Sequence, residues 1–194
     1  MSSRRSPGQR AGLTRPLVLA TARELLAKDG LPALTMRSLA QRLEVSPNAL
    51  YSHIESKTTL IDDVLDDVLA EVDVPDVAVT PPAVGLQALM ASTYGVLLAH
   101  PDLVPLYLAR QGARGPNAQH LGDVVLALLA RADVDGPHAR EALHVLIVYT
   151  IGFAAFTTRA AETLTDGPGS QSQELADNFD SGLCWLLNGI ITPR

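Results

Sequence analysis

Apolar residues along this chain recur every three or four positions, which is the spacing of an amphipathic α-helix. The first such stretch begins at Thr14 and ends at Gly30, and another runs from Ser56 to Val72. No stretch alternates as a half-buried β-strand does, so we expect an all-α fold. Further helices are expected at residues 84–99, 102–110, 118–131, 137–162 and 173–191. The acidic residues expected on the solvent side of the 56–72 helix are Asp62, Asp63, Asp66, Asp67 and Glu71.

Two short helices are expected between the first and second of these stretches. Thr35 begins one that ends near Leu43, and Ser46 followed by Pro47 begins another that ends near His53. A turn of three residues, 44–46, lets the pair cross steeply, so that the second helix can enter a major groove of DNA. The apolar residues expected to hold the pair together are Leu39, Ala40, Leu43, Val45, Leu50 and Ile54. The pattern therefore predicts a helix-turn-helix.

Proline and charge divide the chain into regions. Three prolines within residues 73–83 break the helical pattern and indicate a linker. We expect a disordered basic arm at residues 1–12, a helix-turn-helix domain at 13–58, a connecting helix at 59–72 and a helical domain at 73–194.

Residues 1–60 hold nine Lys or Arg against four Asp or Glu, a net charge of +5. The remainder holds six basic against seventeen acidic residues, a net charge of −11, so a polyanion is attracted to the N-terminal part alone.

Composition excludes several classes of protein. Apolar residues make up 47% of the chain and charged residues 19%, which is typical of a globular protein. One cysteine, Cys184, excludes an internal disulfide framework. The N-terminus has no apolar segment of a signal peptide, and the longest apolar stretch, residues 142–156, is short of the ~20 residues of a membrane span. We expect a cytoplasmic protein without membrane association.

The segment from Leu34 to Lys57 resembles the DNA-binding domain of the tetracycline-repressor (TetR) family. The resemblance rests on LTMRSLAQRL, the V-S turn, ALYSHI and the following K-x-x-L, and it extends over residues 13–72. It implies a base contact for Arg37, base-reading positions at residues 46–49, and phosphate contacts for Thr35, Tyr51, His53 and Lys57. The DNA-binding residues it implies are Thr35, Arg37, Ser46, Pro47, Asn48, Ala49, Tyr51, His53 and Lys57.

Alternatives remain for three of these residues, and two positions depart from the family pattern. Tyr51 could be a half-buried core aromatic, His53 could fill the helix end, and Arg37 could pair with an acid of the first helix. Glu44 stands where the family usually has glycine, which is strained if that position needs a positive φ. Ser52 stands where a large or aromatic residue is common, so the operator contacts are the least defined part of the prediction.

The same resemblance implies that the C-terminal helical domain binds an unknown small-molecule effector and forms a homodimer. Polar or aromatic residues among apolar helices are the pocket candidates. They are Tyr94, His100, Tyr107, Arg110, Gln111, His144, Tyr149, Phe153 and Trp185. The residues expected to supply a dimer interface or the chain's own core are Leu146, Val148, Gly152, Ala155, Phe156, Leu183, Leu186 and Leu187.

No metal or other cofactor is expected. The residues His138, Glu141 and His144 lack the histidine spacing of zinc hydrolases. His100-Pro-Asp resembles the tetracycline-binding regulators, in which a histidine ligates the magnesium ion of the drug complex. Tyr107 stands at the position of that histidine and is a poor ligand for a divalent metal, which argues against magnesium–tetracycline as inducer. We find no phosphate loop, nucleophile elbow or dinucleotide fingerprint, so an enzyme is not expected.

We therefore expect a homodimeric repressor that a small molecule releases from a palindromic double-stranded DNA operator. Two alternatives stay open from the sequence. One is an activator or a ligand-independent regulator on the same fold. The other is a helical small-molecule-binding protein that has lost DNA binding. Glu44 and the acidic helix at 56–72 are the features that suggest it.

Overall fold

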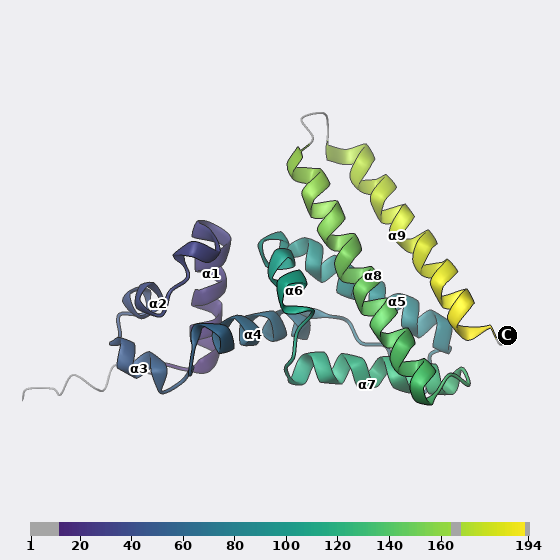
Figure 1. Ribbon diagram of the computed structural model, residues 1–194, viewed down its shortest axis with the longest axis horizontal. Coiled ribbons are helices and arrows are strands. Elements are labelled where there is room, and N and C mark those ends of the chain that lie inside the picture. The colour runs from purple at the N-terminus through teal and green to yellow at the C-terminus, as the bar shows by residue number, and fades with distance from the viewer. Residues whose placement is uncertain (1–11, 164–167, 193–194) are drawn as a thin grey trace, which may run out of the picture. The chain divides into compact units, whose positions relative to one another are not determined.

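The computed structural model describes residues 12–163 and 168–192, and all regular secondary structure in those ranges is helical (Figure 1). The predicted all-α class is confirmed. The chain divides into two compact units, with the boundary between Val64 and Leu65. The predicted basic arm lies outside the described residues, apart from Gly12.

The first unit contains a helix-turn-helix preceded by a longer helix. Its helices are α1 (Arg15–Ala33), α2 (Met36–Arg42), α3 (Pro47–Tyr51) and the first part of α4 (Lys57–Val68). The side chains of Thr14, Thr35 and Ser46 each accept a backbone N–H of the helix they begin, as predicted. Gly30 has a φ of 73°, so the regular part of α1 ends there and a further short turn leads to Leu34.

The helix α4 belongs to both units because the boundary falls inside it. The sequence predicted one connecting helix to residue 72, whereas α4 ends at Val68 and a 3₁₀ turn, η1 (Leu69–Glu71), follows. Leu65, Val68 and Leu69 are buried, and so is Asp66. The boundary between the units lies before these residues and not at the proline-containing linker, because the last turn of α4 is bonded to helices of the second unit.

The second unit is a bundle in which α8 runs beside α9 and packs on α5, α6 and α7 (Figure 1). Its elements are α5 (Pro82–Ala99), η2 (Pro101–Leu103), α6 (Val104–Arg110), α7 (Pro116–Arg131), α8 (Gly136–Thr163) and α9 (Pro168–Ile191). Each predicted helix is present, and α9 begins five residues earlier than predicted. Its buried side chains are mainly Leu and Val at helical spacing, which is why the periodicity could place these helices.

Two helices of this bundle, Pro82–Ala99 and Gly136–Ala160, are long and apolar enough to cross a membrane by length and composition alone. Core helices of soluble proteins also meet that criterion. Here the two helices pack against each other and supply buried residues such as Leu86, Leu89 and Leu146. The bundle accounts for part of their apolar character, since 33% and 28% of their most apolar stretches are buried in it.

Candidate functional site

The turn between α2 and α3 is closed by its own backbone and by buried leucines. Leu39 and Leu50 are fully buried in the first unit. Val45 N–H donates to the Ala40 carbonyl over 3.0 Å, and Glu44 has a φ of 54°. The position at which the family resemblance implied glycine thus has the left-handed conformation, and a glutamate occupies it.

This local structure leaves most of the predicted DNA-binding side chains in solvent. Tyr51 is 49% exposed, which is more than a core aromatic shows. Arg37 has no ion pair within the part of the chain that the structure describes, whereas Arg42 lies 3.8 Å from Glu24 of α1. The exposed members of the predicted set are Thr35, Arg37, Ser46, Pro47, Asn48, Tyr51 and His53. Ala49 and Lys57 are half-buried.

Three of these residues also hold the local structure. The Thr35 hydroxyl accepts from Ser38 N–H over 3.0 Å, and Ser46 Oγ accepts from Ala49 N–H over 3.2 Å. Lys57 Nζ donates to the Leu31 carbonyl over 3.3 Å. Substituting any of the three would therefore remove a structural hydrogen bond as well as a predicted DNA-binding side chain.

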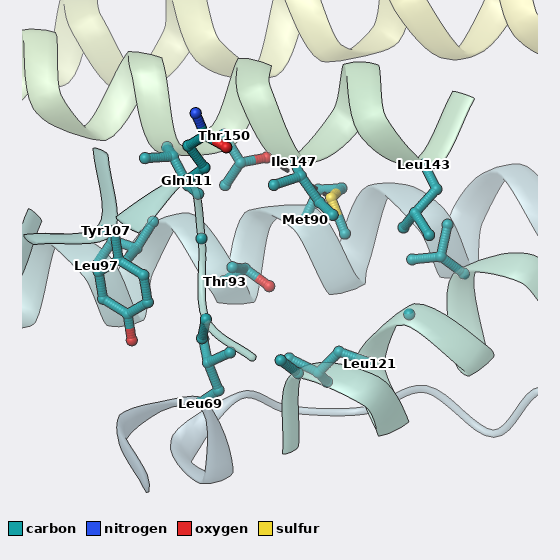
Figure 2. Close-up of a pocket in the computed structure, with 16 residues that line it drawn as sticks. Leu69, Met90, Thr93, Leu97, Tyr107, Gln111, Leu121, Leu143, Ile147 and Thr150 are labelled. Carbon is teal, nitrogen blue, oxygen red and sulfur yellow. Dashed lines mark hydrogen bonds between the residues drawn. The ribbon is translucent and has the colours of Figure 1, made fainter. Parts of the chain in front are cut away.

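A cavity of about 140 Å³ lies inside the second unit. Figure 2 shows Gln111 and Thr150 at the upper left of the cavity, Leu143 at the right and Leu121 below, with Met90 near the centre. The residues that line the cavity are Leu69, Met90, Thr93, Leu97, Tyr107, Gln111, Gly112, Ala113, Ala118, Leu121, Gly122, Val125, Leu143, Ile147, Thr150 and Ile151.

Two of the predicted pocket residues, Tyr107 and Gln111, line this cavity. Tyr94, Tyr149 and Phe153 form an aromatic cluster with Phe179, on which Tyr94 stacks with ring centroids 4.0 Å apart. The cluster is held by hydroxyls: Tyr149 donates to the Phe179 carbonyl, and Tyr94 lies 2.8 Å from Thr157 Oγ1. Tyr94 is buried in the hydrophobic core, Tyr149 and Phe153 are half-buried beside it, and none of the three lines the cavity.

The remaining predicted pocket residues also lie outside the lining. His100 Nε2 is 2.8 Å from Glu71 Oε2, and Arg110 is a half-buried residue in the last turn of α6. His144 is exposed on α8, and Trp185 is 75% exposed on α9. Polar and aromatic character alone could not separate cavity residues from these.

The lining residues that were not predicted from the sequence are aliphatic, small or hydroxyl-bearing. Met90, Leu121 and Ile147 have the same helical spacing as core residues, and Gly122 contributes the absence of a side chain. No signal in a single sequence distinguishes a residue beside a cavity from a residue in a filled core.

The last turn of α4 is bonded to two walls of the cavity. Tyr107 of α6 donates its hydroxyl to the Leu65 carbonyl over 2.5 Å, and this carbonyl is one of the last four of α4, which lack partners within the helix. Asp66, only 5% exposed, accepts backbone N–H bonds from Asn117 (3.2 Å) and Ala118 (2.9 Å) in the first turn of α7. The prediction that Asp66 faces solvent is wrong.

Asp66 takes the place of a local cap for α7. The residue preceding this helix is Gly115, which has no side chain to accept the free N–H groups. A β-carbon on Gly115 would overlap the Asp66 carboxylate, so glycine is required here by space and not by backbone conformation. Asn117 Nδ2 adds bonds to the Asp66 carboxylate (3.2 Å) and backbone carbonyl (3.0 Å).

No group of three or more His, Cys, Asp or Glu that could hold a metal ion occurs among the described residues. His138 Nδ1 and Glu141 Oε2 are 3.4 Å apart on the exposed start of α8. The cavity lining contains no carboxylate, imidazole or thiol. It therefore lacks the side chains that usually bind divalent metals.

Comparison with known proteins supports the helix-turn-helix and the bundle together. A profile described as bacterial regulatory proteins, tetR family, matches residues 18–64. An HTH-type transcriptional regulator of Saccharopolyspora erythraea is 36% identical over 140 residues, which cover 72% of this chain and 59% of that protein. The chain thus spans about three fifths of the length of that relative. The tetracycline repressor protein class D of Escherichia coli is 29% identical over 85% of this chain and 76% of its own.

Solved structures agree over nearly the whole chain. The TetR family protein ActR of Streptomyces coelicolor, in complex with (S)-DNPA, has a TM-score of 0.73 and 27% identity, covering 93% of this chain and 98% of its own. BioQ of Mycobacterium smegmatis has a TM-score of 0.77 and 25% identity, covering 92% of this chain and 98% of its own. The predicted family is confirmed: the chain belongs to the TetR family of bacterial transcriptional regulators.

Proposed function

We propose that this protein is a transcriptional repressor that binds a double-stranded DNA operator as a homodimer and leaves it when a small molecule occupies the cavity of the second unit. The observation that carries the proposal is the exposure of Arg37, Asn48 and Tyr51 on a helix-turn-helix. Its Leu39, Ala40, Leu50 and Ile54 are buried. The +5 charge of residues 1–60 supports it, since phosphate attraction supplies much of DNA affinity. The protein would act in the cytoplasm and would have no catalytic role.

A dimer interface is proposed on α8 and α9. Val145, Val148 and Phe156 are 45%, 71% and 64% exposed, and their spacing of three or four residues, continued through Gly152, makes one stripe along α8. Trp185 of α9 is a further exposed apolar side chain. Exposed apolar patches of this kind mark protein interfaces, and a second copy of the chain is the occupant we propose.

Three of the leucines expected to supply either a dimer interface or the chain's own core have the second role. Leu146 and Leu183 are fully buried and Leu187 is 4% exposed, so these leucines form the core of the single chain and offer no surface to a partner. Every third or fourth position of α8 is apolar on two sides of the helix, and periodicity alone did not show which side is covered.

The last turn of α4 is bonded to Tyr107 through the Leu65 carbonyl and to the first turn of α7 through the Asp66 carboxylate. These bonds offer a route by which a movement caused by effector binding can be transmitted to the DNA-binding unit. A molecule that shifts α6 or the first turn of α7 must move the last turn of α4 with it or break these bonds. Since α4 is one continuous helix shared by both units, such a movement changes the position of the DNA-binding helices. Release requires only that the effector bind the displaced state more tightly.

DNA binding is tested by fluorescence anisotropy with the DNA upstream of the protein's own gene. Arg37→Ala should weaken binding by about 5- to 150-fold, the range for a bidentate base contact of about 1–3 kcal/mol. Asn48→Ala should weaken it and relax the base preference at one operator position. Lys28→Ala, an exposed cation of α1 outside the turn, is the matched control and should reduce affinity far less. Affinity that is unaffected by salt would contradict the proposal.

The dimer and the route through α4 have separate tests. Phe156→Asp should convert the dimer to a monomer in sedimentation velocity, while Val79→Asp, at an equally exposed valine of the linker, should not. Tyr107→Phe removes the bond to the Leu65 carbonyl and should change operator affinity although no DNA-binding side chain is altered. Unchanged affinity and unchanged response to effector in that variant would exclude this route.

A further inference from the structure

The chemistry of the cavity lining restricts what can occupy it. None of the sixteen lining residues carries a charged side chain, and most are Leu, Ile, Val, Met, Ala or Gly. A charged group that enters such a site loses its hydration without gaining a partner, which is far more costly than burying a neutral group. The one buried carboxylate nearby, Asp66, is outside the lining and already accepts bonds from Asn117 and Ala118.

The two threonines of the lining present hydrogen-bond acceptors. Thr93 Oγ1 donates to the Leu89 carbonyl over 2.8 Å, and Thr150 Oγ1 donates to the Leu146 carbonyl over 2.8 Å. Because a hydroxyl has one proton and two lone pairs, each threonine has committed its proton and retains lone pairs to accept a bond. A ligand that donates a hydrogen bond fits these oxygens, and the remaining polar side chains of the lining are those of Tyr107 and Gln111.

The size of the cavity sets the size of the occupant. Apolar cavities of about 150 Å³ lined by aliphatic and aromatic side chains hold a single benzene ring. The cavity here is about 140 Å³, so it has room for one six-membered ring and a small substituent.

We propose that the effector is an uncharged single-ring molecule that donates one hydrogen bond, of the chemical class of a neutral phenol. The ring would lie among Met90, Leu121 and Ile147, and its hydroxyl would donate to Thr93 or Thr150. This assignment rests on the proposed function only in naming the occupant as the effector; the binding chemistry follows from the lining residues themselves.

Three probes of similar ring size test the proposal: 4-methylphenol, toluene and 4-methylbenzoate. They are titrated at pH 7, where a phenol is uncharged and a benzoate is ionised, and binding is followed by chemical-shift changes in the full-length protein. We expect 4-methylphenol to bind about two- to tenfold more tightly than toluene, as one neutral hydrogen bond contributes, and 4-methylbenzoate to bind more weakly than both. Tighter binding of the benzoate, or binding of none of the probes, would overturn the proposal.

Three variants locate the bond and the site. Thr93→Val and Thr150→Val keep the side-chain shape, and one of them should abolish the advantage of 4-methylphenol over toluene without weakening toluene binding. Gly122→Val places side-chain atoms in the cavity, where the nearest neighbour of an added β-carbon is Leu143 at 3.9 Å, and should weaken both neutral probes. An unchanged phenol advantage in both threonine variants, or unchanged binding in Gly122→Val, would contradict the proposal.

Operator binding of the unmodified protein, measured without any probe, separates the two proposals. If the operator is bound but the probes behave contrary to expectation, only the effector class is wrong. If the probes behave as expected but no operator is bound, the cavity chemistry stands and the repressor function is wrong.

Discussion

Replacing Asp66 should destabilise the second unit more than replacing any exposed aspartate, because this carboxylate caps a helix from a distance. Asp66→Ala leaves the N–H groups of Asn117 and Ala118 without their acceptor. Loss of an N-cap typically destabilises by about 0.5–2 kcal/mol, and a carboxylate at a partly buried helix N-terminus adds up to about 2 kcal/mol. Removing a buried charge offsets part of this, so we expect a net loss of about 2–3 kcal/mol.

For a chain of this length, that loss corresponds to a decrease in Tm of about 5–10 °C. Asp66→Asn retains one acceptor oxygen and should lose about half as much as Asp66→Ala. The control is Asp123→Ala, which makes the same charge change at an exposed position further along α7. Thermal unfolding followed by circular dichroism, at one fixed protein concentration, gives the three values on the same scale.

The reasoning is refuted if Asp66→Ala lowers Tm no more than Asp123→Ala does. It is also refuted if amide exchange in the first turn of α7 is no faster in Asp66→Ala than in the unmodified protein. The second measurement matters because a general loss of stability would not single out the N–H groups of Asn117 and Ala118.

Three further predictions concern other positions. Gly115→Ala should destabilise by an amount comparable to Asp66→Ala, and a double-mutant cycle should show that the two losses do not add, since the atoms nearest the new methyl group are those of the Asp66 carboxylate. Burial raises the pKa of Tyr94 and of Tyr149 above the ordinary tyrosine value of 10, so the unfolded chain loses these protons first. The free energy of unfolding should therefore fall as pH rises above 10. In a pH series of thermal melts, the Tm of Tyr149→Phe should fall less steeply than that of the unmodified protein. Glu44→Gly should raise stability by about 1 kcal/mol in urea unfolding, because glycine adopts a φ of 54° without strain, whereas Glu55→Gly should not.

Local features of the fold could be predicted from the sequence because each depends on residues close together in the chain. Thr35 and Ser46 cap helices whose first residues follow them directly, and Gly30 has the positive φ expected at a helix end. The sequence left the sign of φ at Glu44 open, because the family's glycine marks the position where a positive φ can occur but a glutamate stands there; the structure has a φ of 54°. The caps and the helix end depend on backbone geometry within a few residues, which periodicity and cap preferences describe.

The position of Asp66 shows where such reasoning fails. Helical spacing groups Asp66 with Asp62 and Asp63, and a carboxylate is expected in water unless a partner is known. Its partners, Asn117 and Ala118, are more than fifty residues away in sequence, and the need for them arises because Gly115 cannot cap α7. The sequence predicted this helix from residue 118, whereas α7 begins at Pro116 directly after Gly115, so the need for a distant cap became apparent only in the structure.

The cavity of the second unit is harder to predict for a different reason: it is defined by the space that side chains leave unfilled. Tyr107 and Gln111 were selected for their polar groups and do line it, but the same criterion selected Tyr94 and Phe153, whose rings fill space against Phe179. Whether a ring fills a core or borders a void depends on the volumes of all the side chains around it. Gly122, which has no side chain, affects that total as much as any aromatic residue does. The chemistry that an occupant of this cavity must have therefore depends on which residues are small and on where hydroxyl protons are already committed, and both become apparent only once the helices are packed.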